Sequence, residues 1–217
     1  MLKLGVAAAI VVSAYWAIVR VAEAKANALA GGHTFVLDQK SPEEWEAFAA
    51  LRGRLRGWGE SDLAATLFRL QERGDLWVAP DLAGGRSAIY VNALNLVRRV
   101  FIRRDELVAH GLPFPDLDVP ESAQRTFETI RLAGTLFHEL QHYDGLEDED
   151  ATYQREIRWY KELRERVPER LGGDERRLFE WAVDSAIKSA AAAREKAEES
   201  GLESGRRGQV PNVALPG

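Results

Sequence analysis

The 217-residue chain contains no cysteine, and this absence removes several ways in which a protein of this size can be stabilised. Disulfide frameworks, cysteine-rich zinc modules and thiol nucleophiles are all excluded. Any bound metal must therefore be held by histidine and carboxylate side chains. Hydrophobic residues make up 46% of the chain and charged residues 29%, so enough apolar surface is available to bury a core. The length predicts one folded domain with appendages.

The charge balance of the chain bears on whether it can bind nucleic acid. The chain has 29 Lys and Arg residues against 34 Asp and Glu residues, which gives a net charge of -5. A protein with this balance has no global positive field to collect phosphate groups. We therefore do not expect a nucleic-acid partner.

The N-terminal segment, residues 1–30, contains a charge-free apolar run of 16 residues from Leu4 to Val19. A spanning helix needs about 20 apolar residues, and the core of a cleaved signal peptide has about 7 to 15. The run therefore fits either a signal anchor or a signal peptide. Tyr15 and Trp16 stand near one end, as aromatic side chains do at a membrane interface, and they favour the anchor.

Alanine-x-alanine triplets between Ala22 and Ala30 supply candidate cleavage sites for a signal peptidase. Anchor and signal peptide both place the rest of the chain outside the cytoplasm, with the Lys3 end inside. A buried N-terminal helix of a soluble protein is the alternative to both. We expect a membrane-anchored or exported protein with an extracytoplasmic domain.

Residues 31–200 have the pattern of an α+β domain that is mostly helical and contains a small sheet. Apolar residues at helical spacing alternate with short β-branched and aromatic segments between turn residues. Helices are predicted over residues 41–57, 62–73, 121–144, 148–167 and 174–199, and strands over 76–80, 87–92 and 98–104. Residues 201–217 are rich in glycine and polar residues and are predicted to form a flexible tail.

The first globular helix has a start signal in its sequence. Ser41 is a favourable N-cap, Pro42 suits the first helical position, and Glu44 completes a Ser-x-x-Glu capping box. The sequence therefore predicts that the Ser41 and Glu44 side chains satisfy the free backbone N–H groups at this end.

Residues 138–142 read HELQH, inside the predicted helix over 121–144. Residues four apart on a helix share one face, so the rings of His138 and His142 can reach a single ion. Glu139 lies one step around the helix, where its carboxylate can take a proton from a metal-bound water. Such a pattern arises by chance in roughly one chain in a hundred of this composition. The alternative is that His138 and His142 are surface histidines that bind no metal. The other two histidines, His33 and His110, are expected to be ordinary polar residues.

Gly134 stands one turn before His138 on the same predicted helix. Glycine in a helix interior costs about 1 kcal/mol relative to alanine. Its presence predicts the close approach of another chain or a ligand at this turn.

The third metal ligand is expected in the acidic segment that follows the motif. Glu147, Asp148, Glu149 and Asp150 are all candidates. Glu149 falls on one helical face with Thr152, Tyr153, Glu156 and Tyr160, whereas Asp148 is suited to cap that helix. We predict Glu149 as the third ligand, with Asp150 as its main rival.

These residues resemble the metal site of zincin metallopeptidases. HELQHYDGLED is similar to the metzincin pattern, with Gly145 turning the chain and Asp148 in place of the third histidine, but the required methionine turn is missing because Met1 is the only methionine. Asp150 to Tyr153 is similar to the aspzincin ligand segment without its flanking Gly-Thr. The arrangement of His138, His142 and Glu149 most closely resembles that of gluzincins.

The resemblance implies a zinc-dependent peptidase in which Glu139 is the general base and the small sheet packs on the active-site helix. It also implies a peptide or protein substrate, aligned by an edge strand, either RRVFIRR or SAIYVN. Tyr153, Tyr143 or Arg131 is expected to stabilise the oxyanion. The alternatives are a membrane-attached binding or assembly protein on a zincin scaffold, and a helical domain without metal.

Overall fold

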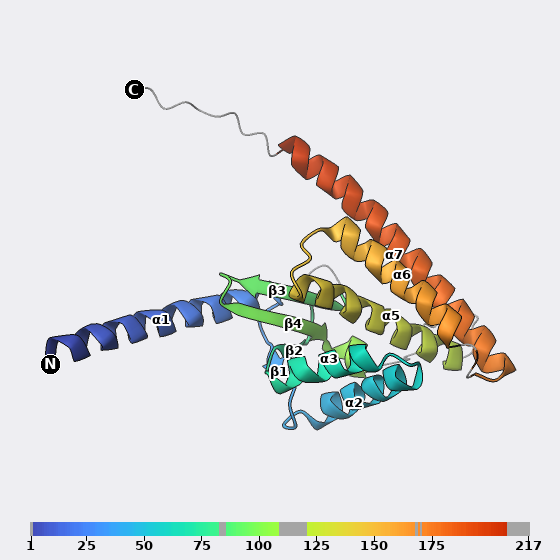
Figure 1. The fold of residues 1–217 in the computed structure, drawn as a ribbon, viewed down its shortest axis with the longest axis horizontal. Coiled ribbons are helices and arrows are strands. Elements are labelled where there is room, and N and C mark those ends of the chain that lie inside the picture. Colours follow the sequence, from blue (N-terminus) through green and yellow to red (C-terminus); the bar gives the residue numbers. More distant parts are fainter. Residues whose placement is uncertain (1, 83–85, 109–120, 168, 170, 208–217) are drawn as a thin grey trace.

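The computed structural model describes residues 2–82, 86–108, 121–167, 169 and 171–207 of the chain. These residues are mostly helical and include one mixed four-stranded sheet, so the α+β class expected from the sequence is confirmed. The elements, in chain order (Figure 1), are α1 (Leu2–Leu29), β1 (Phe35–Val36), α2 (Pro42–Gly57), α3 (Ser61–Glu72), β2 (Leu76–Ala79), β3 (Ala88–Ala93), β4 (Val97–Arg103), α4 (Arg104–Val108), α5 (Glu121–Tyr143), α6 (Glu149–Arg166) and α7 (Gly173–Arg207).

The strands of the sheet lie in the order β1-β2-β4-β3. β2 and β4 are parallel, and both outer pairs are antiparallel. β3, which contains most of SAIYVN, is an edge strand, but β4 is paired on both sides. The expectation that RRVFIRR is an edge strand is therefore wrong, because the pairing of β4 with β2 closes its second side.

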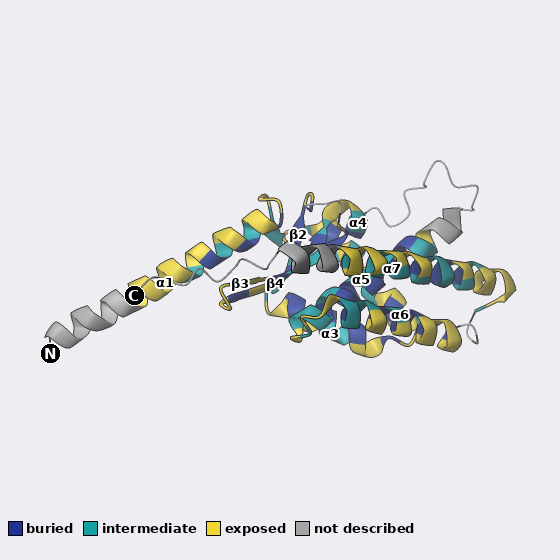
Figure 2. Cartoon of the chain, turned by 90° about the horizontal axis from the view of Figure 1, so that it is seen from above, coloured by how far each residue is buried: buried dark blue, intermediate teal, exposed yellow. Residues whose placement is uncertain are grey.

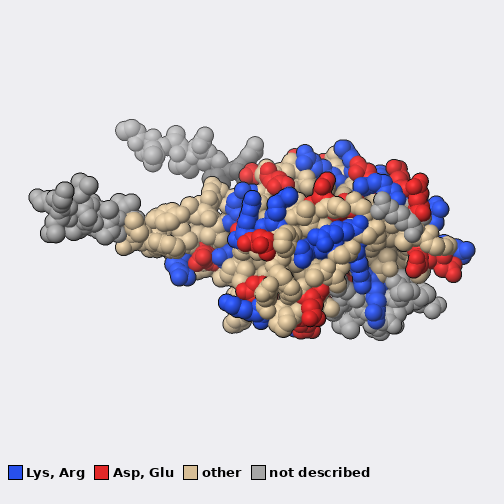
Figure 3. Space-filling model, turned by 60° about the horizontal axis from the view of Figure 1, so that its bottom comes forward, with Lys and Arg blue, Asp and Glu red and all other residues tan. Residues whose placement is uncertain are grey.

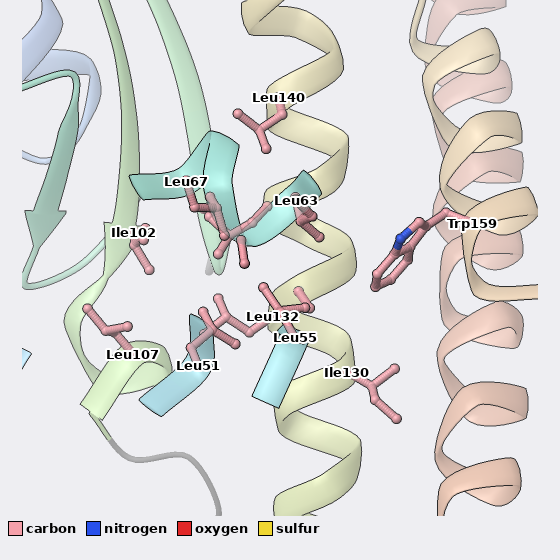
Figure 4. Packing of buried hydrophobic residues seen from close by; sticks show 14 of the residues in the cluster. Leu51, Leu55, Leu63, Leu67, Ile102, Leu107, Ile130, Leu132, Leu140 and Trp159 are labelled. Atoms are coloured by element: carbon pink, nitrogen blue, oxygen red, sulfur yellow. The ribbon is translucent and has the colours of Figure 1, made fainter. Parts of the chain in front are cut away.

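The sheet buries both of its faces. On one face, side chains such as Ala88, Val100 and Ile102 join the main core with α2, α3, α5 and α6. Figure 4 shows this core, in which leucines from α2, α3 and α5 lie in one cluster with Ile102 of β4. On the other face, Val91 and Phe101 pack with alanines of α1. The alternation of side chains along each strand thus supplies two separate apolar surfaces.

Helices α5, α6 and α7 pack against one another beside the sheet (Figure 1). A Cβ atom at Gly134 of α5 would lie only 1.8 Å from Tyr160 Oη and 2.2 Å from Tyr160 Cζ of α6. The close approach expected at Gly134 is confirmed, and the side chain that makes it is Tyr160. α5 and α6 can therefore come together only because position 134 carries no side chain.

Helix α2 begins at Pro42 as expected, but the predicted capping box is wrong. The Ser41 side chain makes no hydrogen bond to the backbone N–H groups at the start of α2. Its Oγ instead donates to the Asp38 carbonyl at 3.0 Å. Glu44 is buried and accepts a hydrogen bond from Arg104 Nε at 2.5 Å. The long-range ion pair with Arg104 thus replaces the local hydrogen bond that the sequence pattern suggests.

Two short elements, β1 and α4, were not expected from the sequence. Helix α7 continues to Arg207, so residues 201–207 of the expected flexible tail are helical, and residues 208–217 lie outside the described part. α1 projects from the body of the protein (Figures 1 and 2). Within the described residues, no helix combines the length and the apolar character needed to cross a membrane. Membrane attachment therefore stays a prediction.

Candidate metal centre

The candidate centre lies where α5 ends and α6 begins. His138 and His142 stand on successive turns of α5, and Glu149 is the first residue of α6. The chain reverses between the two helices at Gly145, whose φ of 100° lies in the left-handed region that favours glycine. This turn brings the Glu149 carboxylate against the two imidazole rings.

The three side chains meet at distances that suit a tetrahedral ion. His138 Nε2 and His142 Nε2 are 3.2 Å apart, and they lie 3.3 and 3.5 Å, respectively, from oxygens of the Glu149 carboxylate. Tetrahedral ligands at about 2.0–2.1 Å from zinc are separated from one another by about 3.3–3.4 Å. The ligand atoms therefore fit three corners of a zinc tetrahedron, and the fourth corner is left for water or substrate.

Hydrogen bonds fix the orientation of both rings. His138 Nδ1 donates to Glu156 Oε2 at 3.1 Å, and His142 Nδ1 donates to the Leu146 carbonyl at 2.6 Å. With Nδ1 protonated in each ring, the Nε2 atoms carry the lone pairs that a metal requires. A carboxylate or carbonyl behind each metal-binding histidine is typical of zinc sites.

The charges of the three side chains are strongly coupled in the metal-free protein. Burial lowers the pKa of His138, but hydrogen bonds to Glu149 and Glu156 outweigh this effect and raise it to about 9. The hydrogen bond with Glu149 also raises the pKa of His142. Hydrogen bonds from His138 and His142 in turn hold the pKa of Glu149 well below its usual range. Without a metal, the protonated histidines and Glu149 thus pair as cation and anion, and a metal ion that binds there displaces the protons between them.

Glu139 lies beside the three candidate ligands rather than among them. Its Oε2 accepts a hydrogen bond of 2.6 Å from the backbone N–H of Tyr90 on β3. Burial raises the pKa of Glu139, against the opposing effect of the nearby His138. A half-buried carboxylate with a raised pKa next to a metal site is suited to accept and return a proton.

The other acidic residues of the segment have different positions. Asp148 caps α6, as expected, by accepting a hydrogen bond of 2.9 Å from the backbone N–H of Ala151. Asp150 pairs with Arg194 of α7 and accepts a 2.6 Å hydrogen bond from Gln154. Glu147 is exposed on the turn. Among these four residues, the structure brings only Glu149 to the two histidines.

The three residues considered for oxyanion stabilisation also differ in position. Tyr143 donates a 2.8 Å hydrogen bond to Asp75, away from the histidines. Arg131 binds Glu106, Glu128 and Ser87 through its guanidinium group. The Tyr153 ring lies 4.5 Å from the His138 ring, centroid to centroid. Of the three, Tyr153 has the best access to a group bound at the centre.

Two cavities, of about 660 and 610 Å³, flank the centre. Both are lined by Arg86, Glu139 and Glu149, so the two cavities adjoin at these residues. The first extends along β3 past Tyr90 and Asn92. The second extends past Tyr153 toward the alanine-rich face of α7. Together the two cavities form a groove that borders the candidate metal centre, beside the edge strand β3.

Sequence reasoning assigned no role in the site to three groups that the structure places there. Glu156 supports His138, the Leu146 carbonyl supports His142, and the Tyr90 N–H holds Glu139. The spacing of seven residues between Glu149 and Glu156 puts both carboxylates on one face of a helix and was a usable signal for Glu156. The two backbone groups depend on tertiary structure and leave no signal in residue type.

Comparisons of the chain with protein families, with curated proteins and with solved structures found no match. The function is therefore inferred from the chemistry of the site itself.

Proposed function

We propose that the protein is a zinc-dependent metallopeptidase that hydrolyses peptide bonds at the centre formed by His138, His142 and Glu149. The convergence of these three ligand atoms at separations of 3.2 to 3.5 Å, with Glu139 beside them, carries the proposal. When bound there, zinc supplies a Lewis acid for the scissile carbonyl and lowers the pKa of a water molecule.

Glu139 acts as the general base and then as the general acid. Its carboxylate takes a proton from the attacking water as the new C–O bond forms, and it returns that proton to the amine nitrogen as the C–N bond breaks. Burial raises the pKa of Glu139, which suits a group that must both accept and release a proton. The Tyr153 hydroxyl donates a hydrogen bond to the oxyanion.

The groove and the edge strand support an extended peptide as substrate. β3 has one side unpaired within the sheet, and the Tyr90 N–H on that side points to Glu139. An extended segment that lies along this edge can bind to backbone groups of β3 other than the Tyr90 N–H, and it then runs beside Glu139 and the proposed metal ligands. The two flanking cavities give side chains on both sides of the scissile bond a place to bind.

We further propose that the N-terminal segment attaches the enzyme to a membrane and keeps the domain extracytoplasmic. The described outer part of α1 exposes Val12, Tyr15, Trp16, Ile18 and Val21 on all sides of the helix. An apolar surface that surrounds a projecting helix fits lipid better than a one-sided protein groove.

The decisive experiment compares the intact protein with its Glu139→Gln variant. We expect about one zinc per chain in both, measured by elemental mass spectrometry, together with cleavage of an unfolded casein substrate by the parent protein alone. Glu46→Gln, which removes an exposed carboxylate on α2 that lines neither cavity, is the matched control and should retain cleavage.

The outcomes separate the candidate functions. Stoichiometric zinc without turnover of any peptide in a broad panel would contradict the peptidase and leave a binding or assembly protein on the same scaffold. Absence of zinc from protein purified without chelators would contradict both the zinc peptidase and the zinc-containing binding or assembly protein.

A further inference from the structure

The inner half of α1 is built into the folded domain. Ala22 and Ala26 of α1, together with Ala30 directly after its last residue, have no exposed surface, and they pack on the face of the sheet opposite to α5. Val91 and Phe101 are among the strand residues in this contact. The small side chains recur every four residues, so they form one face of the helix and allow it to lie close to the strands.

A buried cation ties the same part of α1 to β4. Arg99 is only 8% exposed, and its guanidinium lies 3.8 Å from the centroid of the Trp77 ring. Its two terminal nitrogens donate to Glu23 and Asn27 of α1, each at 3.2 Å. Removal of α1 would therefore leave a largely buried positive charge without these partners, a costly arrangement.

The connection that follows α1 is also closely packed. Gly31 has a φ of 87°, and a Cβ atom there would lie 2.8 Å from the Asp81 carbonyl oxygen after β2. The chain therefore leaves α1 in a backbone conformation that fits against the loop after β2.

We infer that α1 is a permanent part of the domain and that none of the alanine-x-alanine triplets between Ala22 and Ala30 is processed in the folded protein. Cleavage at the first triplet would separate Ala22 and Glu23 from the sheet, and cleavage at the last would remove the whole docked segment. The apolar part of the helix from Val12 to Val21, which belongs to the tan projection in Figure 3, consequently stays attached as part of an uncleaved segment.

This docking also reaches the candidate metal centre. β3 contacts α1 through Val91 and Ala93, and the adjacent Tyr90 holds Glu139 through its backbone N–H. α1 therefore braces the strand that positions Glu139, from the opposite face of the sheet.

The first test is the mature N-terminus of the full chain, expressed in a bacterium with an intact export pathway and purified in the folded state. We expect intact-mass analysis to place the first residue before Ala22. A folded protein that begins at Lys25, Asn27, Leu29 or Gly31 would overturn the inference. This readout does not depend on peptidase activity, so it remains valid if the proposed function fails.

The second test uses two alanines that both belong to candidate triplets. Ala26 is fully buried against the sheet, whereas Ala28 is exposed. In the purified full chain, Ala26→Gln should lower the melting temperature by about 4–10 °C, and Ala28→Gln should change it by less than about 2 °C. Equal melting temperatures for the two variants would overturn the inference, because a helix that is absent or undocked cannot distinguish these positions. Failure of Ala26→Gln alone to fold would support it.

Discussion

Replacement of Gly134 by alanine tests whether the contact between α5 and α6 is as close as the structure indicates. The added Cβ would lie 1.8 Å from Tyr160 Oη and 2.2 Å from Tyr160 Cζ. Non-bonded carbon contacts are favourable at about 3.5–4.0 Å, so the Tyr160 ring must move by about 1.5 Å or more. Tyr160 is only 2% exposed, and the core around it leaves little space for that movement.

The expected loss of stability combines opposing effects. Alanine gains about 1 kcal/mol over glycine in a helix interior, while overpacking a buried site costs about 1–3 kcal/mol or more. Tyr160 also forms a hydrogen bond with Glu156, and losing such a bond costs about 1 kcal/mol. We expect the free energy of unfolding to fall by about 1–3 kcal/mol.

The same displacement should weaken zinc binding. Glu156 contacts both Tyr160 and His138, so movement of Tyr160 disturbs the carboxylate behind a proposed metal-binding histidine. Loss of a supporting carboxylate typically lowers metal affinity by about 10–100-fold. We expect a decrease in this range, measured by competition with a chromogenic chelator.

Gly53→Ala is the matched control, because it is the same substitution in the interior of α2, where a Cβ atom meets nothing within 4 Å. This variant should be unchanged or more stable by up to about 1 kcal/mol in urea unfolding. If Gly134→Ala matched Gly53→Ala in stability and in zinc affinity, the close packing of α5 on Tyr160 would be refuted.

Three further predictions concern the residues around the centre. Glu156→Gln should lower zinc affinity about 10–100-fold in chelator competition, because the hydrogen bond to His138 Nδ1 is weakened; unchanged affinity would contradict this supporting role. Asp148→Ala should cost about 1 kcal/mol in urea unfolding through loss of the α6 cap, with zinc stoichiometry retained; loss of zinc would instead make Asp148 a ligand. In metal-free protein, the folded-state pKa of His138 of about 9 exceeds the value of 6.5 for an unperturbed histidine. The stability contributed by the ion pair of His138 is therefore fully present below about pH 6.5 and is lost as the pH rises toward 9. The urea midpoint of the metal-free protein should fall across this range. A rising midpoint would contradict the ion pair between His138 and its carboxylate partners.

The helices and the approach of the histidines were predictable because they depend on local periodicity. His138 and His142 share a face of α5 by spacing alone, and Gly134 was informative because glycine is costly in a helix interior. The choice of Glu149 depended on which helical face turns inward, and the apolar and aromatic neighbours on that face supplied this information.

Features that depend on long-range partners were not predictable in the same way. The capping box at Ser41 failed because Arg104, 60 residues away from Glu44, competes for its carboxylate. The interior position of β4 follows from its parallel pairing with β2, and strand order leaves no mark in the local sequence. The role of Tyr90 rests on a backbone N–H, which every residue except proline has.

The most direct test of the central claim is anomalous diffraction at the zinc absorption edge, from crystals of the protein grown with zinc. We predict one strong anomalous peak at about 2.0–2.1 Å from His138 Nε2, His142 Nε2 and a Glu149 carboxylate oxygen. A peak coordinated by Asp150 or Asp148 instead of Glu149 would contradict the ligand set, and the absence of any peak between the two histidines would contradict the metal centre.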